Sequence, residues 1–185
     1  MNIFYLDYDP TESARCLVDK HVVKMPIESA QLLSTAHRVL DGTEELCNVT
    51  LYKKTHQNHP SAKWVRNSIE HYRWLYQHYI SICVEYTRRY GKKHKSQTLQ
   101  YALSITPKHL PNDGFVEPPQ VMPNEYKSES TVEAYRDYYR NEKKDIASWS
   151  NTISPPNWFN RPKGYVAHTS FSNLMYRDSI KNERA

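Results

Sequence analysis

The segment 62–90 has the most regular hydrophobic pattern in the chain, and this pattern limits the folds that the sequence can adopt. Apolar and tyrosine side chains recur there every three or four residues, from Val65 to Tyr86. Such spacing places them along one face of an α-helix. Ser61 is a suitable N-cap before the segment, and Gly91 is a suitable stop after it. We therefore expect one long helix over 62–90, whose apolar face other parts of the chain must cover.

A second helical pattern, from about Thr11 to Leu40, predicts the partner for that face. Its apolar residues share helical spacing: they are Val18, Val22, Met25, Leu32, Leu33, Ala36 and Leu40. Thr11 or Asp9 could cap its start, and Asp41-Gly42 would end it. Because proline has no N–H and crowds the preceding turn, we expect a kink or a break at Pro26.

Two further segments shape the predicted fold. Residues 2–8 indicate a short strand or an extended lead-in, and residues 43–60 indicate a loop. Residues 105–126 hold five of the 11 prolines with almost no periodicity, which favours an ordered wrapping loop or a mobile flap over a helix.

A third helix is predicted over 131–149, with Ser130 and Glu133 forming a capping box. The end of the chain, 172–185, is expected to be a mobile tail. The sequence thus predicts a mainly α, single-domain helical fold over 1–185, with a long central helix, a short N-terminal extended segment and a proline-rich wrapping loop.

Composition excludes several classes of protein. No run approaches the roughly 20 apolar residues that span a bilayer, and the start lacks the features of a signal peptide. We expect a cytoplasmic protein, in the host cytoplasm if a phage encodes it, with no membrane partner. The 3 cysteines are widely spaced, and the 4 glycines form no nucleotide-binding loop, so we expect no metal and no cofactor. A net charge of +5 suits a polyanionic partner without proving one.

His21, Lys24 and Glu28 form the first candidate for chemistry. Their i, i+3, i+7 spacing places them along one helical face, opposite the apolar stripe. A carboxylate beside a cation and an imidazole can transfer protons or stabilise a developing positive charge. Spacing alone favours the ordinary alternative, a solvated polar face stabilised by ion pairs one turn apart.

The loop from His56 to His59 is the second candidate, because it lies just before a predicted helix start. Imidazole and amide groups there could receive a phosphate, and a turn with a cap is the equal alternative. A metal site is weaker, since no carboxylate or cysteine matches the two histidines. On the long helix, Trp74 lies between His71 and His78, where it could stack on a base but more often would contact a neighbouring helix.

Basic residues interleaved with aromatic residues give the third candidate, a nucleic-acid-binding surface. The solvated surface of an ordinary protein is the alternative. The candidate contacts to nucleic acid are Lys24, His56, His59, Arg88, Arg89, Lys92, Lys93, Arg136, Arg140, Lys143 and Lys144.

Taken together, these residues resemble the pyrimidine-dimer DNA glycosylase family of the phage endonuclease V type. The similarity lies in their order and spacing. A helix carries Asp19-x-His21 with Glu28 seven residues on, a loop carries Asn58-His59-Pro60, a long helix ends at Tyr90-Gly91, and the C-terminal region is rich in Trp and Tyr.

The resemblance implies an α-helical glycosylase coupled to an abasic-site lyase. In that family the α-amine of the mature N-terminus attacks the sugar C1′, expels the base and leaves a Schiff base. Glu28 would support the cationic intermediate and later proton steps, and His21 would lie near the sugar and phosphate. The candidates at the terminus are Met1 and Asn2: asparagine at position 2 usually leaves Met1 in place, so the nucleophile is Met1 or absent. An α-amine has an ordinary pKa near 8, so part of it is neutral at physiological pH.

Two features depart from the family pattern: Ile27 stands where an arginine is expected before the glutamate, and the segment 105–126 is added. The leading hypothesis is a DNA glycosylase and abasic-site lyase acting on damaged or modified bases. The alternatives are a non-catalytic nucleic-acid-binding protein on the same fold and an N-glycosidic hydrolase acting on a free nucleotide. The expected partner is nucleic acid, with DNA favoured over RNA, and the expected state is a monomer.

Overall fold

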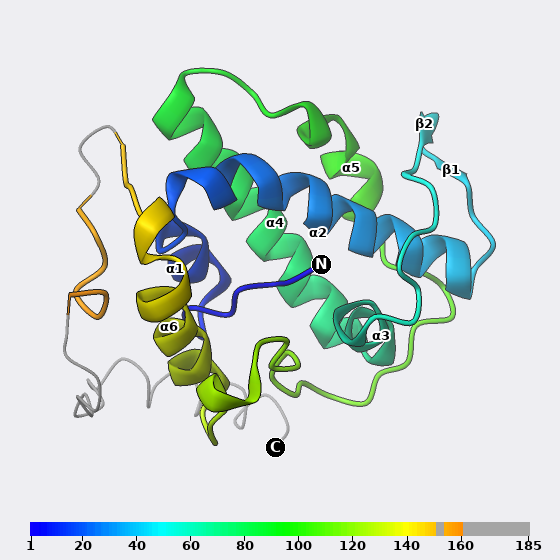
Figure 1. Ribbon diagram of the computed structural model, residues 1–185. Helices are drawn as coiled ribbons and strands as arrows, with labels where there is room; N and C mark the ends of the chain where they lie inside the picture. The colour runs from blue at the N-terminus through cyan, green and yellow to red at the C-terminus, as the bar shows by residue number, and fades with distance from the viewer. Residues whose placement is uncertain (151–153, 161–185) are drawn as a thin grey trace, which may run out of the picture.

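The structure is a computed structural model that describes residues 1–150 and 154–160, and it is mainly α-helical, as predicted (Figure 1). Its helices are α1 (Pro10–Arg15), α2 (Asp19–Leu40), α3 (Pro60–Asn67), α4 (Ile69–Tyr90), α5 (Gln100–Leu103) and α6 (Thr131–Glu142). Short 3-10 helices lie at Lys95–Leu99, Asn124–Tyr126 and Lys144–Ile146, and strands β1 (Glu45–Leu46) and β2 (Val49–Thr50) pair antiparallel. The single domain over 1–185 stays a prediction, and the expected tail 172–185 lies outside the described residues.

The core forms where α2 lies across α4, and α1 also contacts α4 (Figure 1). The two apolar faces predicted from the sequence meet there. Val22 and Leu33 of α2 and Leu75 and Ile82 of α4 are fully buried. Each such side chain contributes roughly 1.5–3 kcal/mol by leaving water. The predicted contact between these segments is confirmed, with α4 as the long central helix.

Of the kink or break predicted at Pro26, the break is wrong, and the kink stays a prediction. Pro26 is buried inside α2, which continues unbroken past it, and the chain instead leaves the helical path between α1 and α2 at residues 16–18. Met25 and Ser29 on either side of the proline are buried as well. Packing on both sides of the proline therefore holds the helix together despite the missing N–H. At the start of α1, Asp9 is the cap, and its carboxylate accepts from the N–H groups of Thr11 and Glu12.

The segment predicted as one helix over 62–90 is two helices, α3 and α4, which meet at Ser68. This residue has an extended backbone, and its hydroxyl accepts from the N–H of Glu70 at 3.3 Å, which caps the start of α4. The N-cap of α3 is His59 rather than the predicted Ser61. Gly91 ends α4 in the left-handed conformation, as the sequence predicted.

Residues 105–126, which we call the strap, form an ordered wrapping segment rather than a flap. Along its length, Pro111 O accepts from Ile69 N at 2.8 Å, and Val116 O accepts from the indole of Trp64 at 2.8 Å. Further on, Pro119 O accepts from the hydroxyl of Tyr135 at 2.8 Å. The strap thus joins the α3–α4 junction to α6, along the lower edge of the molecule in Figure 1.

Helix α6 is shorter than the predicted segment 131–149 and ends at Glu142. Its N-cap is Ser130, as predicted, and the serine hydroxyl accepts from Glu133 N at 3.3 Å. Residues 2–8, all of them described, form no strand and run as an irregular extended segment. Within the described ranges, no helix is long and apolar enough to cross a membrane.

Candidate active site

The amino-terminal lead-in is tied to the rest of the chain by Asn2. Its side-chain oxygen accepts from Ile3 N at 2.8 Å and from Phe4 N at 3.3 Å, while its amide nitrogen donates to Val121 O of the strap at 3.0 Å. Phe4 adopts a left-handed conformation with φ of 52°, which is uncommon outside glycine. These bonds hold the first residues in one place, as an attacking group at the terminus would require.

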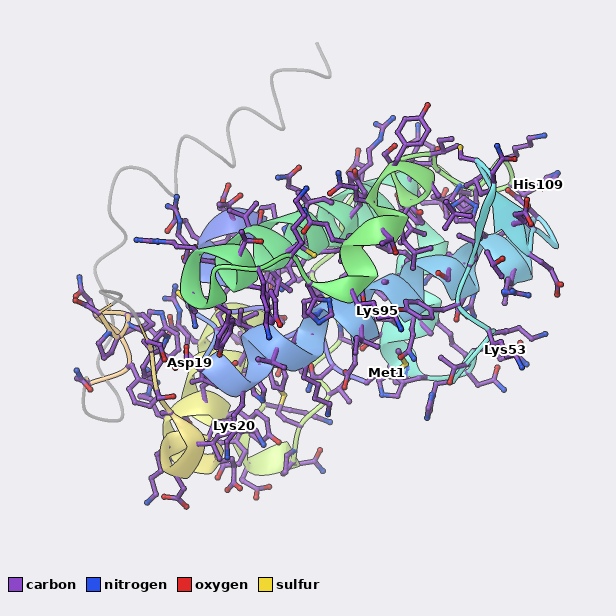
Figure 2. All side chains as sticks on the ribbon, turned by 90° about the horizontal axis from the view of Figure 1, so that it is seen from above. Met1, Asp19, Lys20, Lys53, Lys95 and His109 are labelled. Carbon is purple, nitrogen blue, oxygen red and sulfur yellow. The ribbon has the colours of Figure 1, made fainter. Side chains whose placement is uncertain are left out.

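Glu28 lies directly beside this anchored terminus. Its Oε2 accepts from Asn2 N at 3.2 Å, and its Oε1 pairs with Lys24 Nζ at 3.0 Å. The Glu28 side chain is 14% exposed, whereas that of Lys24 is 69% exposed. The α-amine of Met1 is three covalent bonds from Asn2 N, a reach of at most about 4 Å. The amino terminus lies beside α2 in both views (Figures 1 and 2).

His21 forms the inner wall of this site and is 8% exposed. Its ring stacks on Phe4 with centroids 4.3 Å apart, and its Nδ1 shares a hydrogen bond with the hydroxyl of Tyr139 on α6. Burial and, secondarily, the charges of Lys143 and Lys24 lower the pKa of His21 to about 4. His21 is therefore neutral at physiological pH.

The hydrogen bond with Tyr139 also sets the tautomer of His21. Burial raises the pKa of Tyr139 well above its ordinary value, so the phenol keeps its proton and can donate it to Nδ1. A neutral imidazole that accepts at Nδ1 carries its own proton on Nε2. With Nδ1 accepting from Tyr139, His21 offers a neutral Nε2–H donor.

His59 reaches the same site from the start of α3. Its Nδ1 accepts from Ser61 N at 3.2 Å, so its neutral ring likewise carries the proton on Nε2. Burial, followed by the charges of the terminal amine and His56, lowers the pKa of His59, while Glu28 opposes the shift. The charges of the amine and of the Glu28 carboxylate thus both act on His59. His56 itself is exposed.

The predicted nucleic-acid contacts divide into exposed and buried groups. Lys24, Arg88, Lys92, Lys93 and Lys144 are exposed, and Lys143 is half-buried close enough to His21 for its charge to act on that ring.

Arg89 corrects the prediction, because its side chain is fully buried. It pairs with Asp19 at 3.1 Å and with Glu85 at 3.3 Å, and it donates to Leu17 O at 2.7 Å. Its guanidinium therefore joins α4 to the start of α2 and cannot meet a phosphate.

Arg136 and Arg140 are also engaged with the protein rather than directed at solvent. Arg136 pairs with Asp7 at 3.0 Å and donates to Leu6 O at 2.8 Å, and its guanidinium lies over the Trp158 ring. Arg140 pairs with Asp137 and donates to Trp158 O. Both arginines hold α6 in place, and just after this helix Lys143 is half-buried while Lys144 is exposed.

The aromatic stripe on α4 packs inside the protein, as the ordinary interpretation expected. Trp74 is buried, and its indole donates to Tyr8 O at 2.9 Å. His71 and His78 are buried beside it. Among the described residues, no group of three or more His, Cys, Asp or Glu side chains could hold a metal ion.

Sequence reasoning missed Tyr139, Phe4 and Val121 as parts of the site. Tyr139 is 118 residues from His21, and no spacing rule links them. Asn2 was proposed only as a terminal residue, although asparagine commonly bonds to the N–H groups that follow it, as its side chain does here.

Comparison with known proteins is consistent with this geometry. The family model described as pyrimidine dimer DNA glycosylase matches residues 1–98, more than half of the chain. The chain belongs to this family. Membership makes it a DNA glycosylase of base-excision repair that binds DNA. No curated protein and no solved structure matches the chain.

The matched residues supply the terminus, Glu28, Lys24, His21 and His59, whereas Tyr139 and Lys143 come from the unmatched part of the chain.

Proposed function

We propose that the protein excises a damaged pyrimidine from DNA and then cleaves the strand as an abasic-site lyase, using its terminal α-amine as the nucleophile. The observation that carries the proposal is the 3.2 Å bond between Asn2 N and Glu28 Oε2. This contact holds the end of the chain against a mostly buried carboxylate. Pyrimidine dimers, named in the family description, are the first substrate to test.

The first step replaces one bond to the sugar C1′ with another. The neutral amine forms a bond to C1′ while the glycosidic bond breaks, and the departing base takes the bonding electron pair and a proton. The amine then loses a proton, its lone pair forms the C1′=N bond as the C1′–O4′ bond breaks, O4′ keeps the bonding pair and takes up a proton as a hydroxyl, and a protonated imine remains. The Glu28 carboxylate stabilises this cation most strongly where water is excluded.

Strand cleavage follows by β-elimination. A base removes a proton from C2′, the C3′–O3′ bond breaks, and the 3′ phosphate leaves with the electron pair. Glu28 is the carboxylate at hand for this proton. The Nε2–H groups of His21 and His59 are neutral donors suited to the phosphate and the sugar oxygens.

Either form of the terminus satisfies this geometry. If Met1 is retained, its amine is three bonds from Asn2 N. If Met1 is removed, Asn2 N itself becomes the terminal amine, 3.2 Å from Glu28. Mass spectrometry of the purified protein identifies which amine is present.

Borohydride reduction on a duplex containing an abasic site tests the proposal. The expected result is a covalent protein–DNA adduct whose digestion places DNA on the amino-terminal peptide. Two residues added before Met1 should abolish the adduct, and the same two residues added after Ala185 should leave it intact. Full trapping by the N-terminally extended protein would sink the amine mechanism and leave a hydrolase in which Glu28 activates water.

A further inference from the structure

Two aliphatic side chains are exposed on α2, the helix that carries Glu28. Val23 is 44% exposed and Ile27 is 40% exposed, and they lie one helical turn apart. Ile27 directly precedes Glu28 in the chain. Single exposed aliphatic residues are ordinary on protein surfaces, so the surroundings of this pair decide what it means.

Lysines lie on both sides of the pair. On α2 itself, Lys20 and Lys24 are exposed and lie around the helix between the pair and Glu28. On the other side, His94 Nε2 donates to Val23 O at 3.2 Å, which fixes the segment after α4 against α2. Lys95 in that segment is exposed and lies beside α2, the helix that carries Lys20 (Figure 2).

This combination suits a DNA duplex. Lysines neutralise phosphates, while aliphatic side chains that enter a groove can slip between base pairs and unstack them. A glycosylase must also take its target out of the base stack before it can reach C1′. The pair shares α2 with the glutamate of the site, and the two lysines between them would hold a duplex across both.

We propose that Val23 and Ile27 form a wedge that enters the base stack beside the damaged nucleotide and holds it open while the terminus and Glu28 act on the sugar. This rests on the proposed function. The wedge accounts for an aliphatic residue at position 27, where the family resemblance led us to expect arginine.

A fluorescent duplex tests the wedge without any chemistry. It carries 2-aminopurine next to a tetrahydrofuran abasic analogue, which the protein can bind but not cleave. The wild type should raise the fluorescence on binding, because 2-aminopurine brightens when unstacked. The double variant V23A/I27A should lose most of this rise. Val39→Ala is the matched control, since Val39 is 39% exposed on the same helix but three turns farther along.

A second measurement separates the wedge from the lyase. On a natural abasic site in duplex DNA, V23A/I27A should cleave about tenfold or more slowly, since unstacking a step costs a few kcal/mol. On a single-stranded abasic oligonucleotide, where no stack needs opening, it should match the wild type. Absence of cleavage by the wild type on the abasic duplex refutes the proposed function, whereas the fluorescence still tests the wedge.

Two results would overturn the wedge. One is an equal fluorescence rise in V23A/I27A and in the wild type at saturating protein. The other is the same equal rise in V23A/I27A, accompanied in this variant by loss of a self-association that the wild type shows in sedimentation. That outcome would identify the pair as a contact between copies of the chain.

Discussion

Replacing Glu28 with glutamine separates the chemical role of the carboxylate from its structural role. The substitution removes the ion pair with Lys24, whose side chain is 69% exposed, so solvent screening limits the loss of stability to about 0.5 kcal/mol. The amide oxygen of glutamine can still accept from Asn2 N, and losing the charge from that bond costs about 1 kcal/mol. The free energy of unfolding should therefore fall by no more than about 2 kcal/mol.

The effect on catalysis should be much larger. Removing one preorganised electrostatic group from a transition state typically slows a reaction by about 100- to 1,000-fold. Glu28→Gln should show this loss in single-turnover cleavage of abasic duplex DNA, while urea unfolding reports the small change in stability.

Lys24→Gln is the matched control for this experiment. It removes the same ion pair but keeps the carboxylate and its bond to Asn2, so it should lose similar stability and retain cleavage within about tenfold. Wild-type cleavage by Glu28→Gln refutes the role of the carboxylate. Equal loss of cleavage in both variants shows instead that the ion pair, rather than the carboxylate, is required.

Three further predictions concern stability and binding. Arg89→Met should lower the free energy of unfolding in urea by about 3–5 kcal/mol, because it removes the buried cation that pairs with Asp19 and Glu85, whereas the exposed Arg88→Met should change it by less than about 0.5 kcal/mol. The folded pKa of His21 is about 4 against an ordinary 6.5, so the unfolded chain takes up the proton first as the pH falls. His21 should therefore make the free energy of unfolding of the protein fall by on the order of 3 kcal/mol between pH 6.5 and 4. In a pH series of urea titrations, His21→Gln should show a smaller fall over this range. An equal fall in the variant and the wild type would show that His21 is not buried in its neutral form. In a plot of log binding constant against log salt concentration for duplex DNA, the double variant K92A/K93A should have a slope smaller in magnitude by about 0.9 for each phosphate that the two lysines neutralise in the wild type. An identical slope in the variant and the wild type would show that neither lysine contacts the DNA.

Local rules predicted much of the fold, and they failed where distant packing decided the outcome. Apolar spacing gave α2 and α4 and their contact, and Asp9, Ser130 and Gly91 were identified as helix ends. The continuity of α2 through Pro26 depends on burial on both sides of that residue, which the local sequence does not show.

The break at Ser68 had a local signal that the regular spacing outweighed. Serine followed by Glu70 in the next turn is an ordinary helix start, and the stripe continues across it because both helices bury the same side. Arg89 also had a signal. It lies three residues after Tyr86 and four after Glu85, on the extension of the buried stripe, although its neighbours Arg88 and Tyr90 suggested a basic surface.

The candidate site was predictable as far as it lies on one helix and one loop. Glu28, Lys24 and His21 share α2, and His59 caps the next helix along the chain. The fifth residue of the site, Tyr139, lies on α6, and only the tertiary structure brings it to His21.

The role of Tyr139 explains why the matched first half of the chain needs the second half. A neutral imidazole can place its proton on either nitrogen, and the neighbour of one nitrogen decides which. For His59 that neighbour is Ser61 N, within the matched residues, whereas for His21 it is the hydroxyl of Tyr139 beyond them. Both rings therefore present an uncharged Nε2–H donor. Two such donors can bind phosphate and sugar oxygens without adding positive charge beside an amine that must be neutral to attack. Helix α6 thus contributes to the proposed chemistry through the hydrogen bond between Tyr139 and His21, while the Glu28 carboxylate stabilises the cation that forms on the terminal nitrogen.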